Sequence, residues 1–310
     1  ACVNLIPLAE GGMMRRSGSR YVAELKSSTV KGRLKRFQFS TVQAYVFEMG
    51  AGVFRFYRHQ GRITTNDITA SIANGTFTGN ITNWTDRSGA GSSIAHDATN
   101  DRLNLISNGA TNGHAEQQVT NALAAEHVLK FRVFGAPGNK VKLRVGTTAT
   151  GTEIVNDVEF EVGYHCHAFT ATAADFFVQF LHSTAKTLQI DDISLIDNSA
   201  VEIDTPYTEA QLFTVNGPQS ADVLYLFHPS HPTYKLQRLG HTSWSLAEVA
   251  WTDGPYLAQN TSATTLLPSA ATGLGINLTL SATTGVNGNK GWLSTDIGRP
   301  VRYQKGGTGA

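Results

Sequence analysis

The sequence predicts an all-β protein in which a discontinuous antiparallel β domain is interrupted by a jelly-roll β-sandwich and followed by a small β module. Three observations carry this prediction. Charged residues make up only 16% of the 310-residue chain, and glycines number 30, which is typical of short strands joined by many turns. Apolar and polar residues alternate over many short runs, which is the period of a β-strand. Turn-forming residues such as Gly, Pro and Asn separate these runs.

The first segment, residues 1–70, predicts a small antiparallel sheet. Strands are expected over 20–25, 34–39, 44–49 and 53–57, where apolar residues alternate or cluster. Gly50 and Gly52 mark the turn that joins the last two strands into a hairpin.

The second segment, residues 71–200, predicts the inserted jelly roll. Short alternating runs occupy 127–134, 141–145, 154–162, 176–181 and 188–196, each set off by turn residues. About eight such strands in this length are typical of a two-sheet sandwich.

The chain then returns to the interrupted domain through a hairpin at 219–239. His228-Pro229 and His231-Pro232 stop its first apolar run, because each proline fixes its own φ and pushes the preceding residue into an extended conformation. We expect the hairpin to find its partner sheet in the strands between residues 21 and 57. The aromatic stretches 240–246 and 251–256 should complete that sheet, so that residues 1–70 and 201–256 form one host domain.

From residue 257 to residue 310 the composition shifts to Thr, Ser, Gly and Leu. A clean alternating run at 275–281 and a second strand pair at 291–303 predict a small third β module. We expect this module to be truncated at residue 310.

Charge is unevenly distributed although the net charge is only +1. Residues 1–70 carry 11 Lys or Arg against 4 Asp or Glu, residues 71–200 carry 8 against 13, and residues 201–310 carry 6 against 7. This pattern favours separate surfaces over one uniform nucleic-acid-binding surface. Cys2 and Cys166 are too few for a disulfide framework. No apolar run approaches the roughly 18 residues of a membrane helix, so no membrane span is expected.

The basic character of the first segment is concentrated in seven side chains. They could contact DNA, since each neutralised phosphate adds salt-dependent affinity. They could equally form the wet side of a strand or contact acidic neighbouring subunits, and we prefer subunit contacts to DNA. The seven residues are Arg15, Arg16, Arg20, Lys31, Arg33, Lys35 and Arg36.

A combination of separated motifs resembles the amino-terminal half of the tail tubular, or nozzle, proteins of short-tailed bacteriophages and related prophage virion proteins. One departure is Ser17, because the family usually has Pro before the position of Gly18. The matching segments are Asn4-Leu-Ile-Pro-Leu8, Gly11-Gly12, Arg15-Arg16-Ser-Gly-Ser-Arg-Tyr-Val22, Thr205-Pro-Tyr207, Gln219-Ser-Ala-Asp222, His228-Pro229, Lys235-Leu236, Gly240-His241, Trp244 and Gly254-Pro-Tyr256.

This resemblance implies a virion protein that is made in the bacterial host cytoplasm and assembles as a ring, commonly of six subunits. Such a ring continues the DNA channel below the portal and the adaptor and carries attachment sites for tail fibres. The expected partners are therefore further copies of the chain, the adaptor or other tail proteins, the fibres, and phage DNA in transit.

The second segment resembles the carbohydrate-binding-module-like sandwiches of polysaccharidases and phage structural proteins. The marks are Asn74-Gly75-Thr76-Phe77 with Trp84 downstream, Val141–Val145 followed by Gly146-Thr147, Gly163-Tyr164-His165, and Ile190-Asp-Asp-Ile-Ser-Leu195. The resemblance implies the fold and leaves sugar binding open. The alternative function is accordingly a virion-associated module that binds host surface glycans.

Two groups in this segment have a functional and a structural interpretation. Trp84 could stack against a sugar or belong to the core. Asp191 and Asp192 could help to hold a structural Ca²⁺, because hard carboxylate oxygens suit that ion, or they could cap a turn. We predict no other cofactor.

Evidence for catalysis is absent from the sequence. His165 and His167 would share one strand face, but two ligands do not complete a zinc site, and His228 and His231 are interpreted as turn residues. Neither a Gly-x-Ser-x-Gly turn nor a phosphate-binding Gly loop followed by Lys-Ser/Thr is present. A pair of glycosidase carboxylates cannot be located from sequence because its spacing is spatial. We therefore predict no enzymatic activity and rank a glycan-degrading enzyme last.

Overall fold

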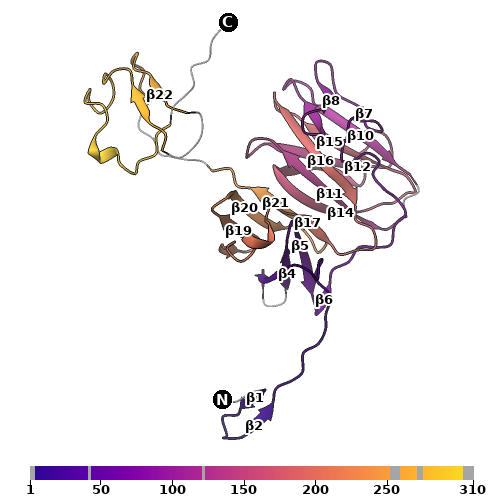
Figure 1. Ribbon diagram of the computed structural model, residues 1–310. Helices are drawn as coiled ribbons and strands as arrows, with labels where there is room; N and C mark the ends of the chain where they lie inside the picture. Colours follow the sequence, from indigo (N-terminus) through magenta and orange to yellow (C-terminus); the bar gives the residue numbers. More distant parts are fainter. Residues whose placement is uncertain (1–3, 41–42, 121–122, 252–258, 271–274, 303–310) are drawn as a thin grey trace. The chain divides into compact units, whose positions relative to one another are not determined.

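The computed structural model describes residues 4–40, 43–120, 123–251, 259–270 and 275–302 (Figure 1). Within these residues the protein is built from antiparallel strands and two short 3-10 helices, without an α-helix, so the all-β prediction is confirmed. No helix in this part of the chain is long and apolar enough to cross a membrane. The chain divides into two compact units, Ala1–Trp251 and Thr252–Ala310.

Four sheets make up the first unit. A two-stranded hairpin pairs β1 (Leu5–Pro7) with β2 (Met13–Arg15). The N-terminal sheet has the order β17-β5-β4-β3, with β6 paired to β5. Its strands are β3 (Arg33–Gln38), β4 (Ala44–Gly50), β5 (Val53–Arg58), β6 (Gly61–Arg62) and β17 (Glu202–Asp204).

The sandwich sheet has the order β13-β12-β15-β10-β7. Its strands are β7 (Thr85–Asp86), β10 (Gly113–Val119), β12 (Lys140–Gly146), β13 (Val155–Glu161) and β15 (Phe176–His182).

The long sheet has nine strands in the order β18-β19-β20-β21-β14-β11-β16-β9-β8. Five of them, counted from β8, belong to residues 71–200, and the other four belong to the stretch after residue 200. The strands are β8 (Ser93–Asp97), β9 (Arg102–Ile106), β11 (Glu126–Phe134), β14 (Gly163–Thr170), β16 (Thr187–Leu195), β18 (Gln219–Ser220), β19 (Val223–His228), β20 (His231–Arg238) and β21 (Trp244–Glu248).

The predicted hairpin at 219–239 is present as β19 and β20, but its sheet partner differs from the expectation. It pairs through β21 with β14 of the inserted segment, where Gly163 lies opposite Ala247 and Cys166 opposite Trp244. The expectation that it and residues 240–246 complete the sheet of residues 21–57 is therefore wrong. Gly163 makes the β14–β21 approach feasible, because a Cβ at this position would lie only 2.2 Å from the Leu246 carbonyl oxygen.

The N-terminal strands still meet the hairpin, but face to face through side chains. The side chains buried between them form a hydrophobic core that we call the second core. In it the Trp244 ring stacks on Phe56 with centroids 3.9 Å apart, and it meets Phe37 and Tyr45 edge-on. Cys166 of the inserted segment belongs to the same core. The pieces before residue 70 and after residue 200 thus share one core with one face of the inserted segment.

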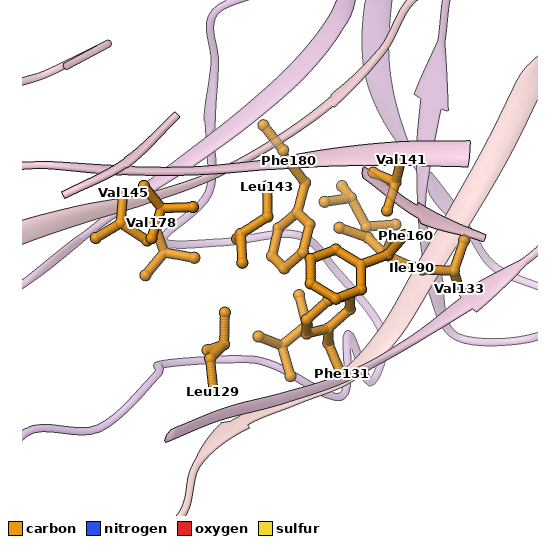
Figure 2. Close-up of a cluster of buried hydrophobic side chains, with 14 of the residues drawn as sticks. Leu129, Phe131, Val133, Val141, Leu143, Val145, Phe160, Val178, Phe180 and Ile190 are labelled. Carbon is orange, nitrogen blue, oxygen red and sulfur yellow. The ribbon is translucent and has the colours of Figure 1, made fainter. Parts of the chain in front are cut away.

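The first core fills the space between the long sheet and the sandwich sheet, as the close-up in Figure 2 shows. Strand β11 contributes Leu129, Phe131 and Val133, whose period of two directs all three to the same face. From the facing sheet β12 contributes Val141, Leu143 and Val145.

Two predicted N-terminal and C-terminal details are wrong. Residues 20–25 form no strand, and the chain after them is held to β4 of the N-terminal sheet, where the Lys26 backbone N–H donates to Glu48 Oε1 at 2.9 Å. The predicted strand pair at 291–303 is replaced, in its described part, by the 3-10 helix Ser294–Asp296.

The second unit otherwise pairs β22 (Leu266–Pro268) with β23 (Leu278–Leu280). The remaining 3-10 helix is Glu209–Gln211. Residues 252–258, which hold most of the predicted 251–256 stretch, and Cys2 lie outside the described residues.

Candidate interaction surfaces

Three parts of the first unit expose side chains that could bind a partner or a ligand: an N-terminal arm, a groove beside Trp251, and a polar face of the long sheet. We define the N-terminal arm as residues 4–24, which comprise the β1–β2 hairpin and the extended chain after it. Leu5 pairs with Arg15 and Ile6 with Met14, so each face of the hairpin carries apolar side chains. The large apolar side chains of the hairpin are exposed: Leu5, Ile6, Leu8, Met13 and Met14.

The arm also carries three of the seven predicted basic residues. Arg15 and Arg16 are exposed and lie on opposite faces of the hairpin because they are adjacent in an extended chain. Arg20 Nη1 donates to Gln60 Oε1 at 3.1 Å, which ties the root of the arm to the turn after β5.

The other four basic residues do not form one surface. Arg33 Nη1 donates to the carbonyls of Leu212, Phe213 and Val215 at 3.1, 3.3 and 2.7 Å. Lys35 Nζ reaches the Gly217 carbonyl at 3.5 Å, and burial together with the Arg33 charge lowers the pKa of Lys35.

Arg33 and Lys35 therefore hold the chain around residues 212–217 against β3. Arg36, with the 64%-exposed Leu34 beside it, points to the opposite, outer face. Lys31 is exposed and its backbone N–H donates to Glu209 Oε1. A single basic surface built from all seven side chains is not supported.

The groove is a cavity of 560 Å³ at the tip of the β19–β20 hairpin. Pro137, Pro232 and other apolar groups lie in its wall, and Glu248 is the only acidic side chain among the described residues that line it. Trp251 is 68% exposed on its rim. The lining residues are Pro137, His231, Pro232, Thr233, Glu248, Val249, Ala250 and Trp251.

The hairpin tip itself confirms the predicted turn. His228 pairs with His231 across Pro229-Ser230, and the two imidazole centroids are 5.2 Å apart. His231 Nε2 contacts Gln211 Oε1 at 2.9 Å. These contacts give both histidines structural partners at the turn.

The polar face lies on the side of the long sheet that points away from the first core. Arg102 and Asn104 alternate with the core residues Leu103 and Leu105, which places them on this side. Register brings Arg132 opposite Asp191 and Arg102 opposite Asp97. We define the polar face as Asp97, Arg102, Asn104, Arg132, Phe134, Gln189 and Asp191.

Hydrogen bonds and stacking connect the polar face across four strands. Arg102 Nη1 donates to Gln189 Oε1 at 3.1 Å, and Gln189 Nε2 lies 2.8 Å from Asp97 Oδ2. The guanidinium carbons of Arg102 and Arg132 lie 3.5 and 4.1 Å from the Phe134 ring centroid. The Arg102 Nε–H is buried and has no partner among the described residues.

The predicted calcium site is not supported. Asp192 adopts a φ of +53° at a β-bulge opposite β11, and its N–H donates to Asp191 Oδ1 at 2.8 Å. Burial raises the pKa of Asp191 to about 6, with the Asp192 charge adding to the effect and Arg102 and Arg132 opposing it. Among the described residues no group of three or more His, Cys, Asp or Glu side chains could hold a metal. The pair shapes the bulge instead.

Trp84 belongs to the core. Its side chain is only 7% exposed, and its ring packs against Phe77 and Phe180. Its Nε1–H donates to the Asn74 carbonyl at 3.2 Å. A ring enclosed in this way has no open face for a sugar, so the glycan interpretation of Trp84 is not supported.

The His165-Cys166-His167 run is also structural. His165 Nε2 donates to the Glu161 carbonyl at 2.8 Å and Nδ1 accepts from Ser245 Oγ at 3.0 Å. Burial lowers the pKa of His165 to about 3 and that of His167 to about 4. Cys166 lies on the opposite strand face, where burial raises its pKa to about 12.

Neither the polar face nor the groove was predicted from the sequence. Their residues come from strands and loops that are far apart in the chain, and only the alternation of Arg102 and Asn104 with leucines was visible. No protein-family model matches this chain, and no curated protein matches it either.

Proposed function

We propose that this chain is a structural subunit of the tail nozzle of a short-tailed bacteriophage and assembles as a homo-oligomeric ring in the virion. The motif set that resembles the nozzle proteins supports the proposal, as does the second core, in which Tyr207, Leu236 and Trp244 of that set pack with side chains of the N-terminal strands. In this role the ring would conduct DNA and offer attachment surface to fibres.

The N-terminal arm is the observation that carries the assembly part of the proposal. An isolated two-stranded hairpin is at best marginally stable in water, and this one exposes apolar side chains on both faces. Full burial stabilises each such side chain by roughly 1.5–3 kcal/mol. A segment of this kind favours a partner surface, and a subunit contact provides one.

Electron microscopy of the purified full-length protein and of the intact virion tests this proposal. We expect closed rings in negative stain and density for the chain below the portal in a virion reconstruction. A protein that stays monomeric at all accessible concentrations and lies outside the tail would refute it.

A second candidate function is glycan binding through the polar face. The observation that favours it is the close array of planar polar side chains around Phe134, with the unsatisfied Arg102 Nε–H among them. Guanidinium, amide and carboxylate groups form paired hydrogen bonds, and adjacent sugar hydroxyls can supply the matching donors and acceptors.

A glycan array with the full-length chain tests this candidate. The full chain is needed because excision of residues 71–200 would expose the β14 edge that β21 covers. Arg102→Ala should abolish any signal, whereas Arg144→Ala, which breaks an Arg–Asp157 pair on the sandwich sheet, should retain it. A wild-type array without signal, or equal signals for both variants, would exclude the polar face.

A further inference from the structure

The groove beside Trp251 has the chemistry to receive a segment that is both apolar and cationic. Pro137, Pro232 and Val249 supply apolar wall, and the exposed Trp251 indole offers a face over which a guanidinium can stack. Glu248 makes no ion pair within the described residues, because the nearby Lys235 is paired with Glu161 at 2.7 Å. The groove therefore presents one free carboxylate beside an aromatic face.

The N-terminal arm has the complementary composition. Each face of its hairpin carries apolar side chains and one arginine, with Leu5, Met13 and Arg15 on one face and Ile6, Met14 and Arg16 on the other. Whichever face enters the groove thus brings a guanidinium. The exposed apolar side of β3 is a poorer match, because Arg36 would repel the arginines of the arm.

The arm of a chain is rooted far from the groove of the same chain. Arg20 is hydrogen-bonded to Gln60, which follows the last residue of β5. Near this end of β5, Phe56 stacks on Trp244 at the start of β21. Trp244 begins β21 and Glu248 ends it, lying opposite Tyr234 in the register of β20 and β21. Trp251 follows three residues after that end. The four residues from Arg20 back to Arg16 span at most about 14 Å, and β21, from Trp244 to Glu248, already covers about 13 Å in the direction of Trp251.

We propose that the N-terminal arm of one copy docks in the Trp251 groove of a second copy, with Arg15 or Arg16 stacked on Trp251 and paired with Glu248. The inference rests on the proposed assembly and names its contact. Because the arm and the groove are different surfaces of the subunit, the contact is heterologous, and head-to-tail repetition closes into a ring when the rotation permits.

A charge swap in the full-length protein, read as mass by analytical ultracentrifugation, tests the contact. One variant combines Arg15→Glu with Arg16→Glu, and the other is Glu248→Arg. Each alone should weaken association at least tenfold, because like charges then face each other. An equimolar mixture should assemble again, since every contact in an alternating ring is either wild type or fully reversed.

Matched controls separate this contact from charge effects and from misfolding. Arg36→Glu changes the charge as each arginine substitution does but lies outside the proposed contact, so its mass should equal the wild type. Thermal unfolding at a protein concentration too low for assembly should match the wild type within error for every variant, since association then adds nothing to stability and Arg15, Arg16 and Glu248 lie outside both cores.

The outcomes distinguish the two proposals. A ring-forming wild type whose two swap variants also assemble, or whose mixture fails to recover, refutes this contact and leaves the proposed function standing. A wild type that stays monomeric at all accessible concentrations refutes this contact, and it refutes the proposed function as well if the protein also lies outside the tail.

Discussion

Replacing Gly163 with alanine tests whether close pairing of β14 with β21 stabilises the protein. A Cβ on Gly163 would lie 2.2 Å from the Leu246 carbonyl oxygen and 2.8 Å from the Ala247 Cα. Both neighbours are backbone atoms, so no side-chain rotation can relieve the overlap. β21 must move by roughly 1 Å before the contact reaches an ordinary van der Waals distance.

The expected cost follows from the bonds that this movement disturbs. Strand β21 is held by backbone bonds to β14 and by the Glu248 N–H donating to the Val162 carbonyl at 2.9 Å. The loss of two such bonds costs about 1 kcal/mol each, and the φ of +148° at Gly163 adds about 1 kcal/mol of backbone strain for a side chain. We expect Gly163→Ala to lower the free energy of unfolding by about 2–4 kcal/mol.

Urea denaturation followed by tryptophan fluorescence measures this difference. Gly61→Ala is the matched control, because a Cβ there meets nothing closer than the Arg58 carbonyl oxygen at 3.7 Å, and its effect should stay within about 0.5 kcal/mol. If Gly163→Ala costs no more than Gly61→Ala, the reasoning about the β14–β21 junction is wrong.

Three further predictions concern acid stability, the tryptophans and metal. The depressed pKa of His165 means that the unfolded chain binds the proton first, so the stability it supports is full above pH 6.5 and declines as the pH falls toward 3. Urea titrations should show a loss of about 2 kcal/mol from this residue between pH 7 and pH 5, and an equal loss in His165→Gln would contradict the assignment. Trp244→Ala should cost about 3–5 kcal/mol of unfolding free energy, whereas Trp251→Ala, at an exposed site, should stay within about 0.5 kcal/mol; similar costs in the same denaturation assay would overturn this contrast. EDTA should leave the Tm unchanged in calorimetry, and a drop that Ca²⁺ reverses would restore the calcium interpretation of Asp191.

Local pattern was sufficient for the elements themselves. The alternation in β11 predicts a strand whose Leu129, Phe131 and Val133 share a face, and the prolines after His228 and His231 predict the hairpin turn. These features depend on neighbours in the chain, through backbone φ limits and the period of two. The all-β fold class follows from the same local signals.

The interaction surfaces depend on which strands become neighbours. In β3 both faces carry apolar residues, Leu34 on one and Phe37 on the other, so the sequence does not indicate that Arg33 turns inward while Arg36 stays outside. The polar face joins Arg102, Arg132 and Gln189 only because β9, β16 and β11 are adjacent in the long sheet.

The sequence by itself thus determined the all-β class, five of the ten described strands between residues 71 and 200, and the turn between β19 and β20. Only the tertiary structure decided that the hairpin extends the sheet of the sandwich, that the N-terminal strands cover it face to face, and that Trp84 is core while Trp251 is exposed. The physical reason is that alternation specifies a strand and its two faces but not its partner. Partner choice depends on close approaches such as the one at Gly163, which involve residues some eighty positions apart.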